Sequence, residues 1–565
     1  MRRPLLAAIA AALVAPVSAT AAEPIMPLSQ VQPGARCSAL TVVRGTAITS
    51  FAVEVLDVID RERPQAARIL IRVSGPAVDA TGIGPGFSGS PILCPDAAGV
   101  MRNIGAISAG IGEFGGTVGL ATPIEQILAE PIQPPSSARR TIARPPPLAG
   151  SRELVTPLTL SGVSPAVAAM FSRGARKSGR TLLTSAAAPR AVIAPQPLAP
   201  GAAVAVGLTS GDVEVGAIGT VAYTDGPNLW LFGHPLDGAG RRSLFLQDAY
   251  IHTVINNPVG AEDLSTYKLG APGNDRGTVT SDGIDALGAR LGALPPNFPV
   301  KVSARDLDTK RTSGLTTRVA DEGDVGRPAG PSILGIAGGA AIAEAATRVL
   351  RGAPARQSGE MCVTITLRER KQPVRFCQHY AVAGGAANAL AGSLAGDFGQ
   401  AAELIDGYEF GVLHVTNVEV GLRLRRGMRQ AFITGVDAPS RARRGKKIKL
   451  RLQLRRTLTG ARFTRTIRVR IPRDVKPGER TIRLAGADAD AGADPDGESE
   501  VTIVIGEEED APTPPQTVDE VAEMIEALER YDGITATIGD DIIEAHRDDD
   551  LRISGDASVR VKIRR

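Results

Sequence analysis

The stretch TGIGPGFSGSPI, residues 81–92, places Ser88 among glycines and prolines directly before an apolar strand pattern. Glycine loses more conformational freedom on folding than other residues, so a cluster marks backbone with positive φ or close approach to another group. A serine nucleophile needs such a turn, because backbone N–H groups must converge on the oxyanion that its attack creates. We therefore take Ser88 as the candidate nucleophile and the N–H groups of Gly86 and Ser88 as oxyanion-hole donors. The alternative interpretation is a plain Gly/Ser turn between two strands.

Short apolar strand patterns flank this turn on both sides. They predict a mostly β domain over residues 28–132, which a Pro-rich stretch ends. Residues 133–199 are then a linker and connecting segment. A second β-rich block over 200–310 opens with AAVAVGLTSGDVEVGAIGTVAYTDGPNLWLFGHPL, in which Asp225-Gly226 is typical of a hairpin turn.

The remainder of the chain changes character three times. Residues 311–430 mix helical and strand patterns. Residues 431–506 hold a basic segment in which apolar residues alternate with Lys and Arg, which predicts a β-sandwich with one solvated face. Residues 507–565 start with an acidic linker, and a capping box at Thr517 and Glu520 then begins a helix followed by short strands, a small C-terminal α+β unit.

Composition describes a globular chain of several domains. The 565 residues are 43% apolar and 22% charged, and the formal net charge of +4 is too small to indicate a partner. The basic segment leaves open a surface for an acidic polymer, but it has few interleaved aromatic residues, so we expect no nucleic acid partner. We expect no metal and no cofactor.

The N-terminus indicates export. A cationic start, an apolar alanine-rich stretch and the small residues 19–21 are typical of a signal peptide over residues 1–21. The segment 333–350 is nearly apolar enough to span a membrane, but its charged residues Glu344 and Arg348 favour a helix of a soluble domain, so no membrane span is expected after signal removal. The predicted location is secreted or in the cell envelope.

Four cysteines agree with an oxidising compartment. Cys362 and Cys377 flank two strand patterns around a polar turn, which brings them together. This predicts the disulfide Cys362–Cys377 and leaves Cys37–Cys94 for the N-terminal domain.

Five histidines are available as a base for Ser88. His234 follows a strand in a Gly-His-Pro turn, which presents the ring at a loop, and it is the first choice. His252 alternates with apolar residues and is the second choice. The remaining three fit a strand histidine or surface positions: His414, His379 and His546.

Two parts of the chain carry a resemblance to a known family. TGIGPGFSGSPI, NIGAISAG and GLATPIEQIL are similar to the serine half of the SpoIVB-type serine peptidase family, and VGAIGTVAYTDGPNLWLFGHPL resembles its glycine-led hairpin that ends in a Gly-His turn. The resemblance covers roughly residues 30–130 and 205–300. It implies a mainly β fold with a two-lobed, chymotrypsin-like β-barrel, in which Ser88 is the nucleophile and His234 the general base.

The sequence departs from that family in two respects. The serine half precedes the histidine half here, an order that triad chemistry permits. In addition, Gly75 stands where the family carries an aspartate, so Asp237 or Asp79 would have to orient the imidazole. The resulting hypothesis is an exported serine endopeptidase acting on a protein or peptide substrate, itself included. The alternatives are a degenerate peptidase-fold scaffold and a cell-envelope binding protein.

Overall fold

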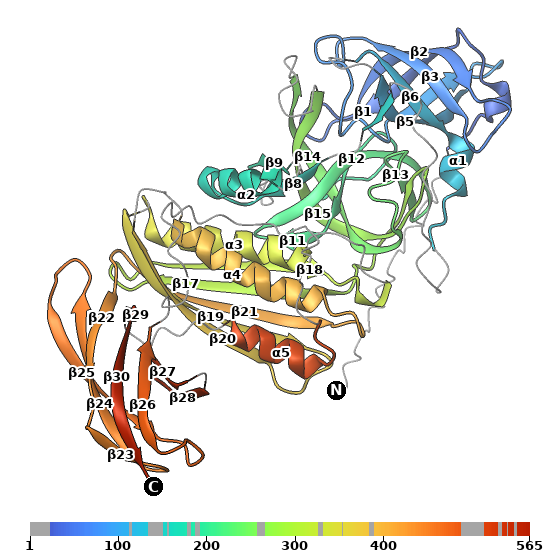
Figure 1. Cartoon of the computed structure of the whole chain (residues 1–565). Coiled ribbons are helices and arrows are strands. Elements are labelled where there is room, and N and C mark those ends of the chain that lie inside the picture. The colour runs from blue at the N-terminus through green and yellow to red at the C-terminus, as the bar shows by residue number, and fades with distance from the viewer. Residues whose placement is uncertain are drawn as a thin grey trace, which may run out of the picture.

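The computed structural model describes residues 23–111, 116–133, 151–154, 157–177, 182–186, 193–256, 266–325, 332–352, 354–383, 389–486, 514–528, 534–539, 541–546, 548 and 551–565. The expected signal peptide over residues 1–21, most of the Pro-rich stretch and most of the acidic linker lie outside them. The fold is mainly β with some helix, as predicted. Figure 1 shows an elongated molecule with the N-terminal strands at one end and the C-terminal strands at the other.

The first unit is a closed six-stranded antiparallel barrel. Its strands, in order around the barrel, are β1 (Arg36–Thr41), β2 (Thr49–Ile59), β3 (Arg68–Ser74), β6 (Val118–Pro123), β5 (Met101–Ile111) and β4 (Pro91–Pro95). β4 pairs with both β1 and β5, which closes the sheet. Alternating residues of β2 fill the interior, because successive side chains on a strand point to opposite faces. Short flanking elements are Leu28–Gln30, α1 (Ile124–Ala129) and β7 (Ser151–Glu153).

The second unit is also a ring of six antiparallel strands. They are β10 (Ala203–Gly207), β14 (Gly240–Asn256), β15 (Thr266–Asp282), β16 (Leu287–Leu291), β13 (Asn228–Leu231) and β12 (Glu214–Asp225). β10 pairs with both β12 and β14, so the pairing returns to its start. The predicted turn at Asp225-Gly226 joins β12 to β13, with Gly226 at φ +56°.

Residues 133–199 are more than the connecting segment that the sequence suggested. β8 (Leu158–Ser161), α2 (Pro165–Lys177) and β9 (Leu182–Ser185) form a β-α-β unit that extends the second sheet beyond β12. The two strands are only four residues long and lie within a Pro-rich part of the chain, so their apolar pattern was too short to predict them.

The third unit is a six-stranded sheet covered by helices. The strand order is β11 (Thr209–Gly211), β18 (Thr312–Ala320), β17 (Asn297–Asp306), β21 (Val415–Arg425), β19 (Arg356–Leu367) and β20 (Val374–Ala383). The expected boundary at residue 310 is therefore wrong, because the hairpin of β17 and β18 belongs to this sheet and not to the histidine-bearing block. A 3-10 turn, Gly323–Val325, follows the hairpin.

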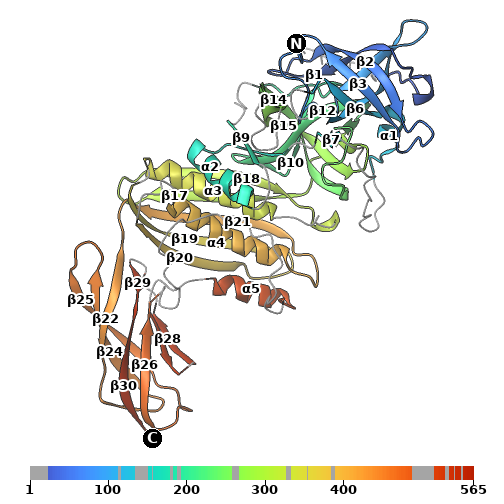
Figure 2. The same ribbon diagram turned by 45° about the horizontal axis from the view of Figure 1, so that its top comes forward.

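Two long helices, α3 (Ile333–Leu350) and α4 (Ala389–Asp406), lie side by side across this sheet (Figures 1 and 2). In the described part of the chain, α3 alone is long and apolar enough to cross a membrane, but 72% of it is buried inside the protein. A Cβ on Gly338 would lie 2.2 Å from the Phe398 ring, so the small residues of α3 serve close packing against α4.

The last unit is a β-sandwich, as predicted, but its composition differs. One sheet holds β25 (Arg462–Arg470), β24 (Lys447–Arg456), β22 (Gln430–Asp437) and β29 (Arg552–Ser554); the other holds β23 (Arg441–Arg443), β30 (Asp556–Arg564), β26 (Gly478–Ala485), β27 (Ile534–Ile538) and β28 (Asp541–His546). The separate C-terminal unit over 507–565 is thus a wrong prediction. Its strands complete the sandwich, while its helix α5 (Val518–Ala527) packs near β20 and α4.

Both predicted disulfides are confirmed. Cys37–Cys94 joins β1 to β4 in the first barrel, and Cys362–Cys377 joins directly opposite residues of β19 and β20. Two disulfides are compatible with an extracellular or secreted protein.

Candidate active site

The Gly-rich loop before β4 lies pressed against the second ring of strands. A Cβ on Gly84 would come 1.9 Å from the carbonyl oxygen of Thr266, and one on Gly89 would come 2.1 Å from that of Thr220. Gly89 also has φ +85°, which favours glycine in its own right. The glycines are therefore required by the close approach of β12 and β15 to the loop.

Two backbone hydrogen bonds hold the loop in this position. Thr220 N donates to Ser88 O at 2.9 Å, and Lys268 N donates to Pro85 O at 2.9 Å. Thr220 Oγ1 also donates to Gly86 O at 3.1 Å. The loop of the first unit is thus bound by strands of the second.

The amides of the loop fall into two groups. Those of Phe87, Gly89 and Ser90 donate to backbone carbonyls at 2.8–3.0 Å. Within the described residues, no carbonyl or side chain accepts from the N–H of Gly86 or of Ser88. The N–H of Gly84 also has no acceptor there. The sequence predicted two of these three amides, those of Gly86 and Ser88, as oxyanion-hole donors, and both residues are buried.

The Gly-His turn reaches the same place from the second ring. Gly89 N donates to Ile107 O at 2.8 Å, and a Cβ on Gly233 would lie 3.2 Å from that same oxygen. Thr122 Oγ1 donates to Gly233 O at 2.7 Å, which fixes the turn on β6. The residues next to Ser88 and to His234 therefore meet at one carbonyl of β5.

The imidazole of His234 has a defined orientation. Its Nδ1 lies 2.6 Å from Pro235 O, and since a carbonyl oxygen only accepts, Nδ1 carries the proton. In the neutral ring the lone pair is then on Nε2, the form that a general base requires.

The serine and the histidine are both enclosed. Ser88 is 0% exposed and His234 is 3% exposed. In the part of the chain that the structure describes, Ser88 Oγ has no hydrogen-bond partner, so the bond from serine to histidine is not formed in this conformation. Catalytic hydrogen bonds are often long before substrate binds.

Both proposed acids have hydrogen-bond partners of their own. The Asp237 carboxylate accepts two hydrogen bonds from Arg242 Nη1, at 2.7 and 2.8 Å. Desolvation acts to raise the pKa of this carboxyl, but a hydrogen bond with Asp282 and the charge of Arg242 hold the pKa below its usual value. Asp79 accepts from Gly75 N at 2.7 Å and so closes its own turn. The sequence suggested Asp237 because it comes three residues after His234, and named Asp79 as a second candidate.

A residue that the sequence analysis missed anchors the histidine turn. Asp282, at the end of β15, is 0% exposed and accepts hydrogen bonds from the backbone N–H groups of residues 236–239 at 2.7–3.3 Å. Burial raises the pKa of its carboxyl to about 7, an effect that the neighbouring Asp237 strengthens and Arg242 opposes. No motif marks Asp282, because its four donors come from a turn some 45 residues earlier.

A second missed residue is Lys268, which is buried between the two units. Its Nζ donates to Thr41 Oγ1 at 2.6 Å and to Thr220 Oγ1 at 3.3 Å, and lies 4.6 Å from the centre of the Phe87 ring. Thr41 Oγ1 in turn accepts from Ser90 Oγ at 3.1 Å. Ser90, the other serine of the motif, therefore belongs to a buried hydroxyl network.

The other histidines lie elsewhere. His252 Nε2, near the C-terminal end of β14, is 3.2 Å from Ala186 O. His414 lies between Glu369 and Asp324, with ring nitrogen to oxygen distances of 2.7 and 3.0 Å. The side-chain surroundings of His546 fall outside the described residues.

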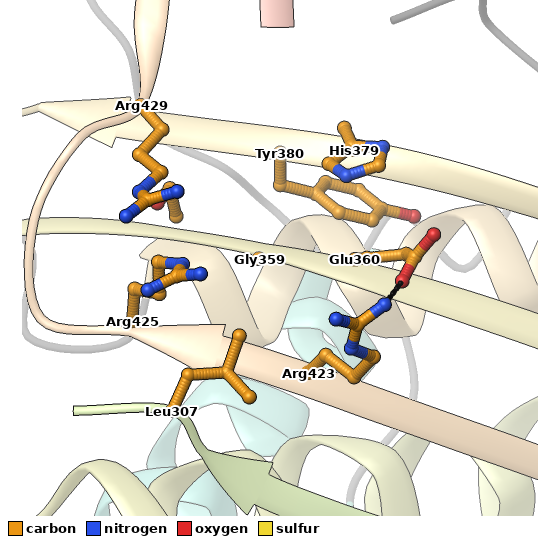
Figure 3. Close-up of a pocket in the computed structure, with 9 residues that line it drawn as sticks. Leu307, Gly359, Glu360, His379, Tyr380, Arg423, Arg425 and Arg429 are labelled. Atoms are coloured by element: carbon orange, nitrogen blue, oxygen red, sulfur yellow. Dashed lines mark hydrogen bonds and ion pairs between the residues drawn. The ribbon is translucent and has the colours of Figure 1, made fainter. Parts of the chain in front are cut away.

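His379 lines a shallow pocket on the sheet of the third unit (Figure 3). Three arginines surround it, of which Arg423 forms an ion pair of 3.1 Å with Glu360. The remaining arginines of the pocket are Arg425 and Arg429. Most residues that line this pocket belong to β19, β20 and β21, Leu307 and Arg429 lie just outside strands, and none belongs to the serine loop.

No family model matches this chain, and neither does a curated protein or a solved structure at the significance required of a match. In the described residues, no group of three or more His, Cys, Asp or Glu side chains is placed to hold a metal ion. Function therefore has to be inferred from the geometry of the serine loop and the Gly-His turn.

Proposed function

We propose that the chain is an exported serine endopeptidase with a two-lobed, chymotrypsin-like double barrel. The two closed rings of strands support this architecture, since each contributes one turn to the same place. The motif resemblance to SpoIVB-type serine peptidases supports it independently. The substrate would be a protein or peptide, with this chain itself included.

The observation that carries the proposal is the pair of available amides at Gly86 and Ser88. Among the described residues, the N–H groups of Gly84, Gly86 and Ser88 in this loop have no acceptor, and the two nearest the serine in the chain, those of Gly86 and Ser88, would form the site for an oxyanion. A plain structural turn gains nothing from leaving buried donors without acceptors, since each costs desolvation free energy.

The chemistry follows from these groups. Ser88 Oγ attacks the scissile carbonyl carbon while Nε2 of His234 takes the hydroxyl proton, and the amides of Gly86 and Ser88 stabilise the oxyanion. His234 then gives its proton to the leaving amine, and the acyl group remains on Ser88 until water, deprotonated by His234, releases it. Since both side chains are enclosed, the loop and the turn have to separate to admit substrate.

A catalytically degenerate scaffold is the second candidate. The enclosed Ser88 and the ion pair of Asp237 with Arg242 favour it, because an enclosed hydroxyl does not meet substrate and Asp237 is already bound by another side chain. Under this alternative, the loop serves to join the two barrels.

The test is labelling of the purified chain with a fluorophosphonate probe, which reacts only with activated serines. We expect label on Ser88 in the wild type, loss in Ser88→Ala and in His234→Gln, and retention in the matched control Ser90→Ala. We expect Ser88→Ala also to fold normally, since Ser88 Oγ has no hydrogen-bond partner among the described residues. A folded wild type that takes no label would favour the scaffold. Label that survives Ser88→Ala but is lost in Ser90→Ala would show that Ser90, and not Ser88, is the nucleophile.

A further inference from the structure

The outer face of strands β24 and β25 in the sandwich carries an unusual arrangement of charge. Ten residues point outward from this strand pair, and seven are Lys or Arg: Lys447, Lys449, Arg451, Arg455, Arg462, Arg468 and Arg470. The other three are Gln453, Thr464 and Thr466. We call these seven residues the cationic ladder.

The register places like charges directly opposite one another. Lys447 faces Arg470, Lys449 faces Arg468, and Arg455 faces Arg462. Like charges opposed across two strands are destabilising. Neighbours along a strand are about 7 Å apart and partners across it are about 5 Å apart, which is within the Debye length of about 8 Å at physiological salt. Solvent therefore does not fully screen this repulsion.

Across the register of the neighbouring strand β22, the ladder faces one acidic residue, Asp437. Within the described residues, none of the ladder's members forms an ion pair, and its one side-chain hydrogen bond runs from Arg470 to Gly445 O at 3.5 Å. Asp437 lies opposite Arg451 on β22, but its carboxylate accepts instead from Gln453 at 3.3 Å. By contrast, Arg465 on the inner side of β25 pairs with Asp548.

We propose that the cationic ladder binds a linear acidic polysaccharide. The ladder over residues 447–455 is roughly 27 Å long but only two strands wide. This long, narrow surface matches the shape of an extended polymer chain. The strands twist along their length, so a flexible chain can follow the row of cations, whereas a flat lipid surface meets only part of it. Arg guanidinium groups bind carboxylates through two parallel hydrogen bonds.

The side chains of the ladder argue against other polyanions. None of the ten outward-facing residues is aromatic, and the neighbouring strand β22 adds one exposed aromatic ring, Phe432, opposite Arg455 at one end of the ladder. Successive bases of a single-stranded nucleic acid would therefore find no row of stacking partners. None of the ten is apolar, and the exposed apolar side chains nearby, Phe432 and Leu458, lie only at the Arg455 end, so most of the ladder offers nothing to insert between lipid tails. The position of β24 and β25 at the outer edge of the sandwich leaves this face clear of the other units (Figure 1).

The experiment measures binding of the full chain to polygalacturonate at 0.15 M salt, with neutral dextran, phosphatidylglycerol vesicles and a single-stranded DNA oligonucleotide as comparisons. The ladder variant is Lys449→Gln, Arg451→Gln and Arg468→Gln together. The control variant is Arg36→Gln, Arg63→Gln and Arg72→Gln, which removes the same charge from exposed positions of the first barrel.

We expect the wild type and the control to bind polygalacturonate with equal affinity, and the ladder variant to bind at least tenfold more weakly with a shallower salt dependence. The ladder variant should unfold at the same temperature or higher at low salt, since like-charge repulsion is relieved. Equal binding by ladder and control variants, no binding by the wild type, or tighter binding to vesicles or DNA would overturn the proposal. This inference does not depend on the peptidase activity.

Discussion

At the scale of single residues, Lys268 is the group whose environment departs most from what its type suggests. Lysine is seldom buried without a carboxylate, yet Lys268 is 1% exposed and its Nζ contacts two threonine hydroxyls and the face of Phe87. Burial lowers the pKa of its ammonium from the usual 10.5 to about 7. Lys268 is therefore a titrating group between the barrels at neutral pH.

This pKa predicts how stability depends on pH. Between pH 7 and 10.5 the unfolded chain holds the Lys268 proton and the folded chain has released it, so the free energy of unfolding should rise with pH. The rise is up to about 1.4 kcal/mol per pH unit. Chemical unfolding at pH 7.5 and 9.5 checks it, with Lys268→Met as the reference that lacks the group. Parallel pH dependence in the two proteins would contradict the prediction.

At the scale of elements, the serine loop shows what its glycines do. Gly89 and Gly99 have nearly the same φ angle, +85° and +80°. They differ in surroundings, because a Cβ on Gly89 would meet Thr220 O at 2.1 Å, whereas nothing lies within 4 Å of one on Gly99. Substitutions at these two glycines therefore distinguish the cost of backbone strain from the cost of a clash between the two barrels.

Gly89→Ala should therefore destabilise far more than Gly99→Ala. Both substitutions carry the cost of a left-handed alanine, about 1 kcal/mol, and Gly89→Ala adds the displacement of β12, on the order of 2 kcal/mol more. Denaturant unfolding of the two variants measures the difference. Equal losses would mean that the loop is not packed on β12.

At the scale of the whole molecule, the C-terminus is part of the structure that precedes it. β30 lies between β23 and β26 in the sandwich, and β29 pairs with β22 in the opposite sheet. These pairings join residues more than 70 positions apart, such as Arg483 and Ser558. The sandwich cannot close its core without the last strands.

Deletion of residues 551–565 should open the sandwich and leave the rest folded. Without β30, the buried side chains of β26, including Ile482 and Leu484, lose their cover. Limited trypsin digestion measures this, because β24 and β25 are rich in Lys and Arg. We expect cleavage within 441–470 in the truncated chain only, while β19 and β20, joined by Cys362–Cys377, stay protected in both. Continued protection of 441–470 would show that residues 430–486 fold alone.

The sequence by itself determined the features that depend on local pattern. Alternating residues identify β2 and β24, the turn at Asp225-Gly226 identifies a hairpin, and cysteine spacing leads to both disulfides. The same kind of signal selected Ser88 and the amides of its loop. Each of these depends on residues close together in the chain, where backbone preference and side-chain period act directly.

Only the tertiary structure decided which distant segments meet. The environment of Lys268 is made by Thr41, Phe87 and Thr220, and the turn after His234 is held by Asp282, with no motif to connect them. Likewise, β17 and β18 join the third sheet through β21, and the C-terminal strands join the sandwich. Strand pairing uses backbone groups that every residue carries, so the choice of partner is made by packing of the whole chain and leaves no local trace in the sequence.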